Sequence, residues 1–234
     1  MATTILTQLT AMAEAQQKSL TQLLTAYCQE RLLYRLSVSS YNDQFYLENI
    51  ALQEIALLTT ANAQQATIAK HAFQEICAME GLEDELIFLG SELASSVTAN
   101  CIRLKIPAKI ADKTIYIEVM IYCQERTRIT PKLSSVPALL DMEPAMLYTY
   151  PVEFVLAQKI VAQDDRAIVQ LMAAHPIEGR ALQGYVEELL DQQRLTMEAC
   201  QSLTVHRQLQ PFLAAILTEN EYFQQWYANN QAWQ

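Results

Sequence analysis

The chain has 234 residues, of which 51% are hydrophobic and 18% are charged, and its formal net charge is −10. This composition is that of a globular protein that can bury a core, and the length fits one or two domains. The negative field repels phosphate backbones, so general nucleic-acid binding is disfavoured. The same charge favours solubility and a basic surface on any partner.

Targeting and metal-binding signals are weak. The apolar stretches, such as residues 211–217, are too short to span a bilayer, and the N-terminus lacks the basic leader and apolar block of a signal peptide. The five cysteines are widely spread and include no CxxC pair, which predicts buried, reduced thiols in a cytoplasmic protein. The three histidines are isolated, so no metal site is predicted from them.

The first third of the chain is predicted to form a long helix, a strand and a second helix. Leucines recur at helical spacing over residues 17–38, and a polar cluster at 39–43 predicts a loop. Residues 45–47 read as a short strand. A helix then runs to about Leu58, capped by an Asn side chain in the turn. That turn consists of Glu48, Asn49 and Ile50.

The middle of the chain changes from helical to strand periodicity. A helix is predicted over 66–79, with Gly81 as its C-terminal cap, and a short strand over 85–89. Apolar and polar residues then alternate over 100–110 and 114–123, which predicts two half-buried strands joined by a hairpin turn.

After Thr130 the chain is predicted to be helical, following an irregular connector punctuated by four prolines. The predicted domains are therefore an α/β domain with N-terminal helices over 1–130 and a helical domain over 131–234. The expected helices cover residues 152–163, 165–174, 184–193, 196–210 and 211–233. The aromatic side chains near the C-terminus, from Tyr222 to Trp233, lack flanking Lys and Arg, which favours a packing role over base stacking.

Several sequence blocks in a fixed order carry a resemblance. They are ERLLYRLS at 30–37, HAFQEICAMEGL at 71–82, PALLD at 137–141 and YTYPVEFVLAQKI at 148–160. Together, over Tyr27 to Gly184, they resemble the AbiEii/AbiGii toxin family of nucleotidyltransferases. The resemblance implies an α+β fold with a nucleotidyltransferase-like small mixed sheet flanked by helices, followed by a helical C-terminal bundle.

The chemistry of that family needs a phosphate-binding turn and a pair of carboxylates. Its turn is Lys-Gly-Gly, in which backbone N–H groups approach the triphosphate; here Glu48, Asn49 and Ile50 occupy those positions, and Glu48 would repel the ligand. Its DxD pair holds Mg²⁺. We expect that pair between the post-turn helix and the next helix, and residues 59–65 contain no Asp or Glu.

Two of the family's functional positions survive. Glu118 occupies the place of an Asp on the inner strand, and Lys159 occupies the place of a Lys in the motif AEKF. Each also has a purely structural interpretation. Glu118 can be an inward polar residue paired with Lys159 or Arg103, and Lys159 can be a surface residue of an amphipathic helix.

The resemblance therefore implies a degenerate, catalytically inactive nucleotidyltransferase-like protein that acts as a binding or regulatory module, without a metal site or cofactor. A possible partner is a cognate antitoxin or another protein. The alternative is an active toxin that uses Mg²⁺ and an NTP to transfer NMP to RNA or protein. It would recruit acids such as Asp43, Glu48, Glu54 or Glu118. A third interpretation is an oligomeric protein assembled through its C-terminal aromatic residues.

Overall fold

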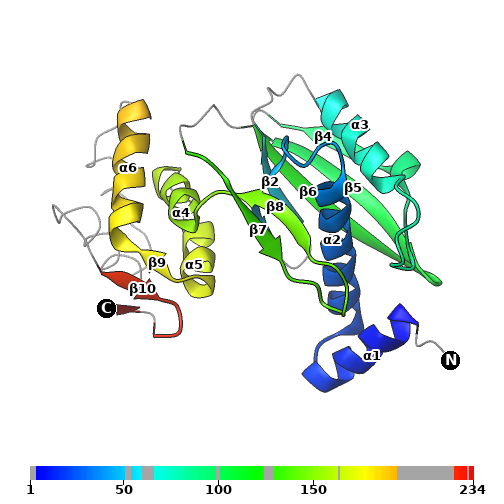
Figure 1. The fold of residues 1–234 in the computed structure, drawn as a ribbon. Helices are drawn as coiled ribbons and strands as arrows, with labels where there is room; N and C mark the ends of the chain where they lie inside the picture. Colours follow the sequence, from blue (N-terminus) through cyan, green and yellow to red (C-terminus); the bar gives the residue numbers. More distant parts are fainter. Residues whose placement is uncertain are drawn as a thin grey trace. The chain divides into compact units, whose positions relative to one another are not determined.

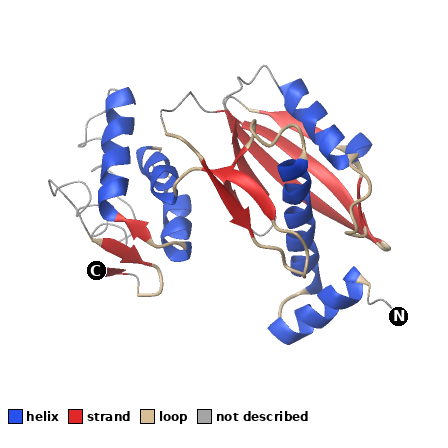
Figure 2. Ribbon diagram, viewed as in Figure 1, coloured by secondary structure: helices blue, strands red, loops and turns tan. Residues whose placement is uncertain are grey.

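The computed structural model describes residues 4–50, 54–59, 66–98, 101–123, 129–162, 164–193, 224–230 and 232–234. The chain divides into two units, Met1–Thr149 and Tyr150–Gln234. Each described part combines helices and strands, so the chain is α+β, as the sequence predicts (Figure 1, Figure 2).

The described residues of the first unit form three α-helices: α1 (Ile5–Gln16), α2 (Leu20–Val38) and α3 (Ala66–Cys77). The second of them begins in a capping box, in which Ser19 and Gln22 satisfy each other's backbone N–H groups. Between α1 and α2, Gln17 adopts a left-handed φ of 53°, which ends α1 and turns the chain. The α2 and α3 predictions are confirmed, whereas α1 was not predicted.

An eight-stranded mixed sheet forms the body of the first unit. Its strands are β1 (Tyr46–Ile50), β2 (Glu54–Thr59), β3 (Leu86–Phe88), β4 (Ala94–Val97), β5 (Cys101–Ile110), β6 (Lys113–Cys123), β7 (Lys132–Val136) and β8 (Ala145–Thr149). Their order is β3-β5-β6-β2-β1-β8-β7, and β4 also pairs with β5. The β2–β6 and β1–β8 pairs are parallel and the others antiparallel.

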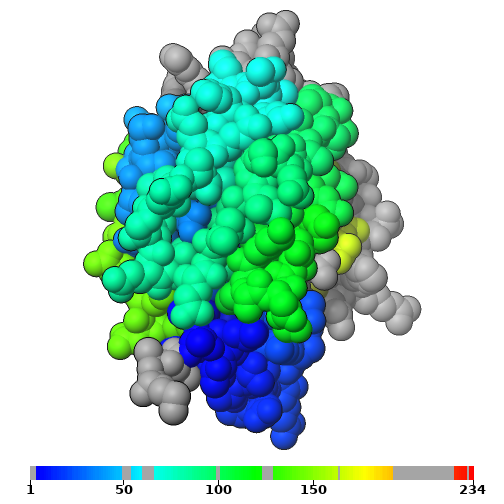
Figure 3. All heavy atoms as spheres, turned by 90° about the vertical axis from the view of Figure 1, so that its right-hand side faces the viewer, coloured from blue at the N-terminus to red at the C-terminus, as the bar shows by residue number. Residues whose placement is uncertain are grey.

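The core lies between the helices and one face of this sheet. Alternate residues of β6, including Ile117, Val119 and Ile121, are 0% exposed and join the same cluster as Tyr27 and Phe73 from the helices. The predicted alternation of β6 and the hairpin with β5 are therefore confirmed. On the surface in Figure 3, α1 (dark blue) adjoins the segment that precedes β3, where the Ile5 N–H donates to Glu85 Oε2 at 3.2 Å.

The predicted helix after Glu48 is wrong. Residues 54–59 form the central strand β2, which pairs with β1 on one side and with β6 on the other. Its side chains from Ile55 to Thr59 are all buried. A continuous apolar run of this length has no diagnostic period, because a strand that is buried on both faces does not alternate between apolar and polar residues. Asn49 therefore pairs in a strand rather than capping a helix.

The irregular connector expected after Thr130 is also wrong where the structure describes it. Residues 132–136 and 145–149 form β7 and β8, which pair with each other, and β8 continues the sheet beside β1. The first unit therefore extends to Thr149, whereas the sequence placed a domain boundary after residue 130.

The second unit contains α4 (Val152–Val161), α5 (Asp165–Ala174), β9 (Ile177–Glu178), α6 (Gly179–Gln193), β10 (Gln225–Tyr227) and β11 (Ala232–Trp233). The three strands form a small sheet, so the helix expected up to Trp233 is wrong at its end. Trp226 is 8% exposed and contacts Trp233 edge to face at 5.7 Å, which is a packing role. Tyr222 and the helix expected over 196–210 lie outside the described residues.

Among the described residues, the helices are too short or too polar to cross a membrane.

Candidate functional site

The face of the sheet that does not pack against the helices carries Glu118. Its neighbours in sequence, Ile117 and Val119, are in the core, and because successive strand residues point to opposite faces, Glu118 points away from it. On β2, Ile55 and Leu57 are likewise in the core, so Ala56, which lies between them, is on the opposite face.

Glu54 and Glu118 are direct neighbours on that face. They are register partners in the parallel pair β2–β6. The backbones of neighbouring strands in a sheet lie about 4.8 Å apart. The structure thus brings together two carboxylates that the sequence named among several acids. The next position on the same face of β2 is Ala56, which is buried at 9% exposure. Two adjacent carboxylates can bind a hard cation or share a proton.

A basic pair lies beside these carboxylates on β5. Arg103 Nε is 4.0 Å from Glu118 Oε2, with both side chains well exposed, so this contact contributes little stability. Lys105 is the register partner of Glu118, and its Nζ lies 4.6 Å from the ring centre of Tyr116. The predicted pairing of Glu118 with Arg103 is therefore observed.

The residues predicted as a phosphate-binding turn lie within β1. Asn49 pairs with Ala56 and Ile50 pairs with Ile55 across the β1–β2 ladder. Glu48 falls at a β-bulge, where the register shifts between Leu47 and Asn49.

Two other sequence predictions concern Lys159 and the interval expected to contain DxD. Lys159 lies in the last turn of α4 in the second unit, where a cation suits the helix dipole. Of the interval expected to contain DxD, Thr59 ends β2, and 60–65 lie outside the described residues.

A buried ion pair lies on the helix side of the sheet, and sequence reasoning missed it. Arg35 and Asp84 are each 3% exposed, and Arg35 Nη2 donates to both carboxylate oxygens at 3.1 and 3.0 Å. The same guanidinium donates to the carbonyls of Cys77 and Leu86, and it lies 4.6 Å from the ring centre of Phe88. These hydrogen bonds use both terminal nitrogens of Arg35, so the pair fixes the loop before β3 to α2.

A second charged group on α2 fixes the loop before β8. Glu30 accepts from the Leu139 N–H at 2.7 Å, and Arg31 donates to the Glu143 carbonyl at 2.6 Å. Glu30 and Arg31 also contact each other at 2.7 Å, without the geometry of a hydrogen bond. Burial raises the pKa of Glu30, and the hydrogen bond to Glu143 raises the pKa of Tyr34.

Tyr27 connects the two loops. Its hydroxyl donates to the Asp84 carbonyl at 2.9 Å and lies 3.5 Å from Met142 Sδ, and the ring is 0% exposed. Burial, followed by the nearby Asp84 charge, raises the pKa of Tyr27 above its ordinary value, so the phenol remains a donor at neutral pH.

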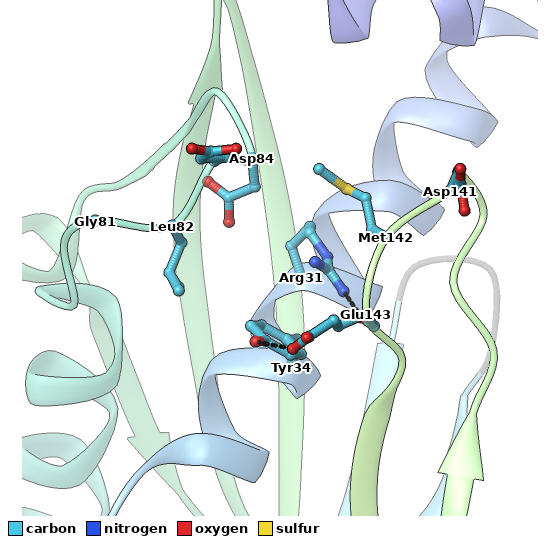
Figure 4. A pocket seen from close by; sticks show the side chains of 9 residues that line it. Arg31, Tyr34, Gly81, Leu82, Asp84, Asp141, Met142 and Glu143 are labelled. Carbon is cyan, nitrogen blue, oxygen red and sulfur yellow. Dashed lines mark hydrogen bonds between the residues drawn. The ribbon is translucent and has the colours of Figure 1, made fainter.

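Between these loops lies a cavity of about 420 Å³. Its walls are Arg31 and Tyr34 of α2, the loop Gly81–Asp84 and the loop Asp141–Glu143, which Figure 4 shows on either side of the helix. Gly81 has φ +79°, a conformation that side chains rarely adopt.

Three of the blocks that carry the family resemblance meet around this cavity. ERLLYRLS supplies the charged residues of α2, the block HAFQEICAMEGL supplies Gly81 and Leu82 of one wall, and PALLD leads into the other. The available signal was the set Glu30, Arg31 and Arg35 in a helix without other charged residues, since such charges are buried only when paired.

No protein-family model and no curated protein matches this chain. Among solved structures, a proposed nucleotidyltransferase from H. pylori is 10% identical, with a TM-score of 0.42 over 79% of this chain and 81% of its own. The structure of JHP933 from Helicobacter pylori is also 10% identical, with a TM-score of 0.43 over 85% of this chain and 89% of its own.

Proposed function

We propose that this protein is a degenerate nucleotidyltransferase-like protein of the AbiEii type, catalytically inactive, that acts as a binding or regulatory module. The ordered blocks LLYRLS, PALLD and YPVEFVLAQK support the family assignment. The mixed sheet preceded by a long helix is compatible with the fold that the resemblance implies. The proposal includes a cytoplasmic location, reduced cysteines and a protein partner such as an antitoxin.

The inactive state is supported mainly by the identity of the residues on the face of β2 that carries Glu54. A DxD pair presents its two carboxylates from the same face of a strand, because side chains at i and i+2 point the same way. On β2 the residues at that spacing beside Glu118 are Glu54 and Ala56. Ala56 carries only a methyl group, so β2 presents one carboxylate on this face, whereas a DxD pair would present two oxygen ligands to Mg²⁺.

A further charge argument supports the same conclusion. Glu48 stands where the resemblance places the Lys that neutralises phosphate. Arg103 lies 4.0 Å from Glu118, where a cation competes with a metal for the carboxylate.

The second candidate is an active nucleotidyltransferase with a rearranged metal site. The register pairing of Glu54 with Glu118 favours it, because adjacent carboxylates can share one metal whose ligand oxygens lie at about 2.0 to 2.6 Å. In this case Mg²⁺ and an NTP are cofactor and substrate, and RNA or a protein is the acceptor.

Labelling with radioactive NTPs tests the proposal. The full chain is incubated with Mg²⁺, each NTP and tRNA, RNA or protein acceptors, beside the variants Glu118→Gln and Glu92→Gln. The latter removes an exposed charge outside this face and serves as the matched control. We expect no label in any reaction and no heat on calorimetric titration with Mg²⁺–NTP. Label that is retained in Glu92→Gln and lost in Glu118→Gln would establish the active alternative.

A further inference from the structure

Strand β4 forms part of an edge of the large sheet, and its outer side is open. Among the described residues it pairs only with β5, and its four side chains are exposed. The Thr98 N–H donates to the Cys101 carbonyl at 2.9 Å, which continues the same ladder as a hydrogen-bonded pair. Such pairs alternate along antiparallel strands, so Ser95 and Val97 direct their N–H and C=O groups away from β5.

The neighbouring part of this edge is capped by the protein itself. On β3, which also pairs with β5, the Leu86 carbonyl accepts from Arg35 Nη2 and the Leu86 N–H donates to Asp84 Oδ1, both at 3.2 Å. The outward groups of Ser95 and Val97 have no such partner in the described part of the chain. Strand β4 also contains no charged residue or proline, which commonly protect an edge from pairing. Main-chain hydrogen bonds to an added strand can therefore form here.

Two cations lie next to β4, on the face of the sheet opposite the helices. Arg103 is the register partner of Ser96, and Lys105 is the register partner of Ala94. Lys105 lies over a tyrosine ring and forms no ion pair with a described residue. The Nε of Arg103 makes an exposed, weak contact with Glu118 at 4.0 Å, and its terminal nitrogens have no hydrogen-bond partner among the described residues. Both charges are therefore available to an acidic group.

These cations can reach an added strand across β4. The backbones of β5 and the added strand would lie about 9.6 Å apart, twice the spacing of neighbouring strands. A Lys or Arg side chain and a Glu side chain span this distance together. The intervening side chains on this face, Ala94 and Ser96, are small and do not block the approach.

The two faces of β4 define which side chains an added strand needs. Ser95 and Val97 pair with core residues of β5, so they lie on the helix side, whereas Ala94 and Ser96 lie on the side of the cations. Val97 is 51% exposed and offers apolar surface. Because successive residues of a strand point to opposite faces, alternating acidic and apolar residues would meet the cations with one set and Val97 with the other.

We propose that β4 accepts, as an additional strand, an extended segment of a partner protein in which acidic and apolar residues alternate. Main-chain hydrogen bonds to Ser95 and Val97 hold the segment, and its acidic side chains contact Arg103 and Lys105. Such a segment specifies the partner of the binding module proposed above, so the proposal rests on that role but not on the loss of transferase activity. Its test needs no NTP and leaves Glu118 unchanged, and the labelling experiment needs no peptide, so the two can fail independently.

The experiment is a titration of the ¹⁵N-labelled full chain with blocked hexapeptides, followed by NMR. The alternating acidic probe is Glu-Val-Glu-Val-Glu-Val. One comparison probe has the same residues in the order Glu-Glu-Glu-Val-Val-Val, and the other is Lys-Val-Lys-Val-Lys-Val. The reordered peptide cannot place its acids on one face and should bind at least about fivefold more weakly. The basic peptide should also bind more weakly, although the net charge of −10 attracts it.

Hydrogen exchange of the β4 amides reports the added strand directly. The acidic probe should slow exchange at Ser95 and Val97, whose N–H groups point outward in the free chain. The amides of Ser96 and Thr98 already donate to β5, so their exchange should change much less, which provides a control within the same segment.

A pair of variants tests the charge contacts. Lys105→Gln should weaken the acidic probe about two- to fivefold, as expected for one exposed ion pair. Lys109→Gln is the matched control, because Lys109 lies on the same face of β5 but pairs with Ile87 of β3. It is about 13 Å from Lys105 along the strand, beyond the screening length of about 8 Å at physiological salt, so the affinity should stay unchanged. Both lysines are exposed, so both variants should fold.

Five results would overturn the proposal. Unchanged exchange at Ser95 and Val97 would show that no strand is added, and equal weakening by Lys109→Gln would show that the cations beside β4 are not special. Equal or tighter binding of either comparison peptide would contradict the required pattern. Equally tight binding of a six-nucleotide RNA would indicate a site for anions in general. A dimer of the free chain in sedimentation experiments, with slow exchange at Ser95 and Val97, would assign the edge to a second copy of this chain.

Discussion

Replacing Asp84 by Asn should strongly destabilise the first unit. The change removes a carboxylate that is 3% exposed and leaves Arg35 buried with its charge uncompensated. Two charge-assisted hydrogen bonds from Arg35 Nη2, at 3.1 and 3.0 Å, are lost or weakened, each worth about 1.5 to 3 kcal/mol. Breaking one partner of a buried pair costs about 3 to 5 kcal/mol, and we expect a loss of unfolding free energy in this range.

Urea unfolding followed by far-UV circular dichroism measures this loss. The matched control is Asp112→Asn, which removes an exposed carboxylate at the tip of the β5–β6 hairpin and should change the free energy by less than about 0.5 kcal/mol. Tryptophan fluorescence follows the second unit separately, because both tryptophans of the sequence, Trp226 and Trp233, lie in it.

A double variant distinguishes the free-energy cost of leaving one buried charge unpaired from the contribution of the ion pair itself to stability. Arg35→Met with Asp84→Leu removes both charges, so it should be less destabilising than Asp84→Asn alone. The reasoning about the buried pair is refuted if Asp84→Asn behaves like Asp112→Asn, or if the double variant loses more stability than the single one.

Two further predictions concern titration. Because burial raises the folded-state pKa of Glu30, the folded state binds more protons than the unfolded state, so this group lowers stability as pH rises above about 4.3. The difference in unfolding free energy between Glu30→Gln and the wild type should therefore shift in favour of the variant as the pH rises above about 4.3, as measured by urea titrations at several pH values. A difference that does not change with pH would contradict the assignment. Burial also raises the pKa values of Cys28 and Cys77 to about 12, so iodoacetamide should label them at pH 8 only in urea, as read by mass spectrometry; rapid native labelling would show that they are accessible.

The elements that the sequence predicted well are those whose pattern has one interpretation. Strand β6 alternates cleanly because one face lies on the core and the other is partly exposed, and α2 repeats its leucines over several turns. The hairpin between β5 and β6 is local, so nothing distant in the sequence was needed to place it.

Strand β2 could not be predicted in the same way, because its neighbours are remote in sequence. Its apolar run is buried on both faces, which suits a helix as well as a strand. With a helix expected there, the sequence also did not indicate that Glu54 lies beside Glu118. Strands β7 and β8 were missed because β7 is a mostly exposed edge strand, and because the parallel partner of β8, β1, lies far away in the sequence.

The parallel pairing of Leu47 on β1 with Thr149 on β8 has a consequence for how the chain folds. The β5–β6 hairpin can close early and fast, because only a short loop must be ordered. The edge formed by β1 stays without a neighbour until the ribosome has produced the strand that ends at Thr149. Until then an unpaired strand edge is exposed to other chains, so the last part of the first unit to be synthesised is the part that protects the nascent protein from aggregation.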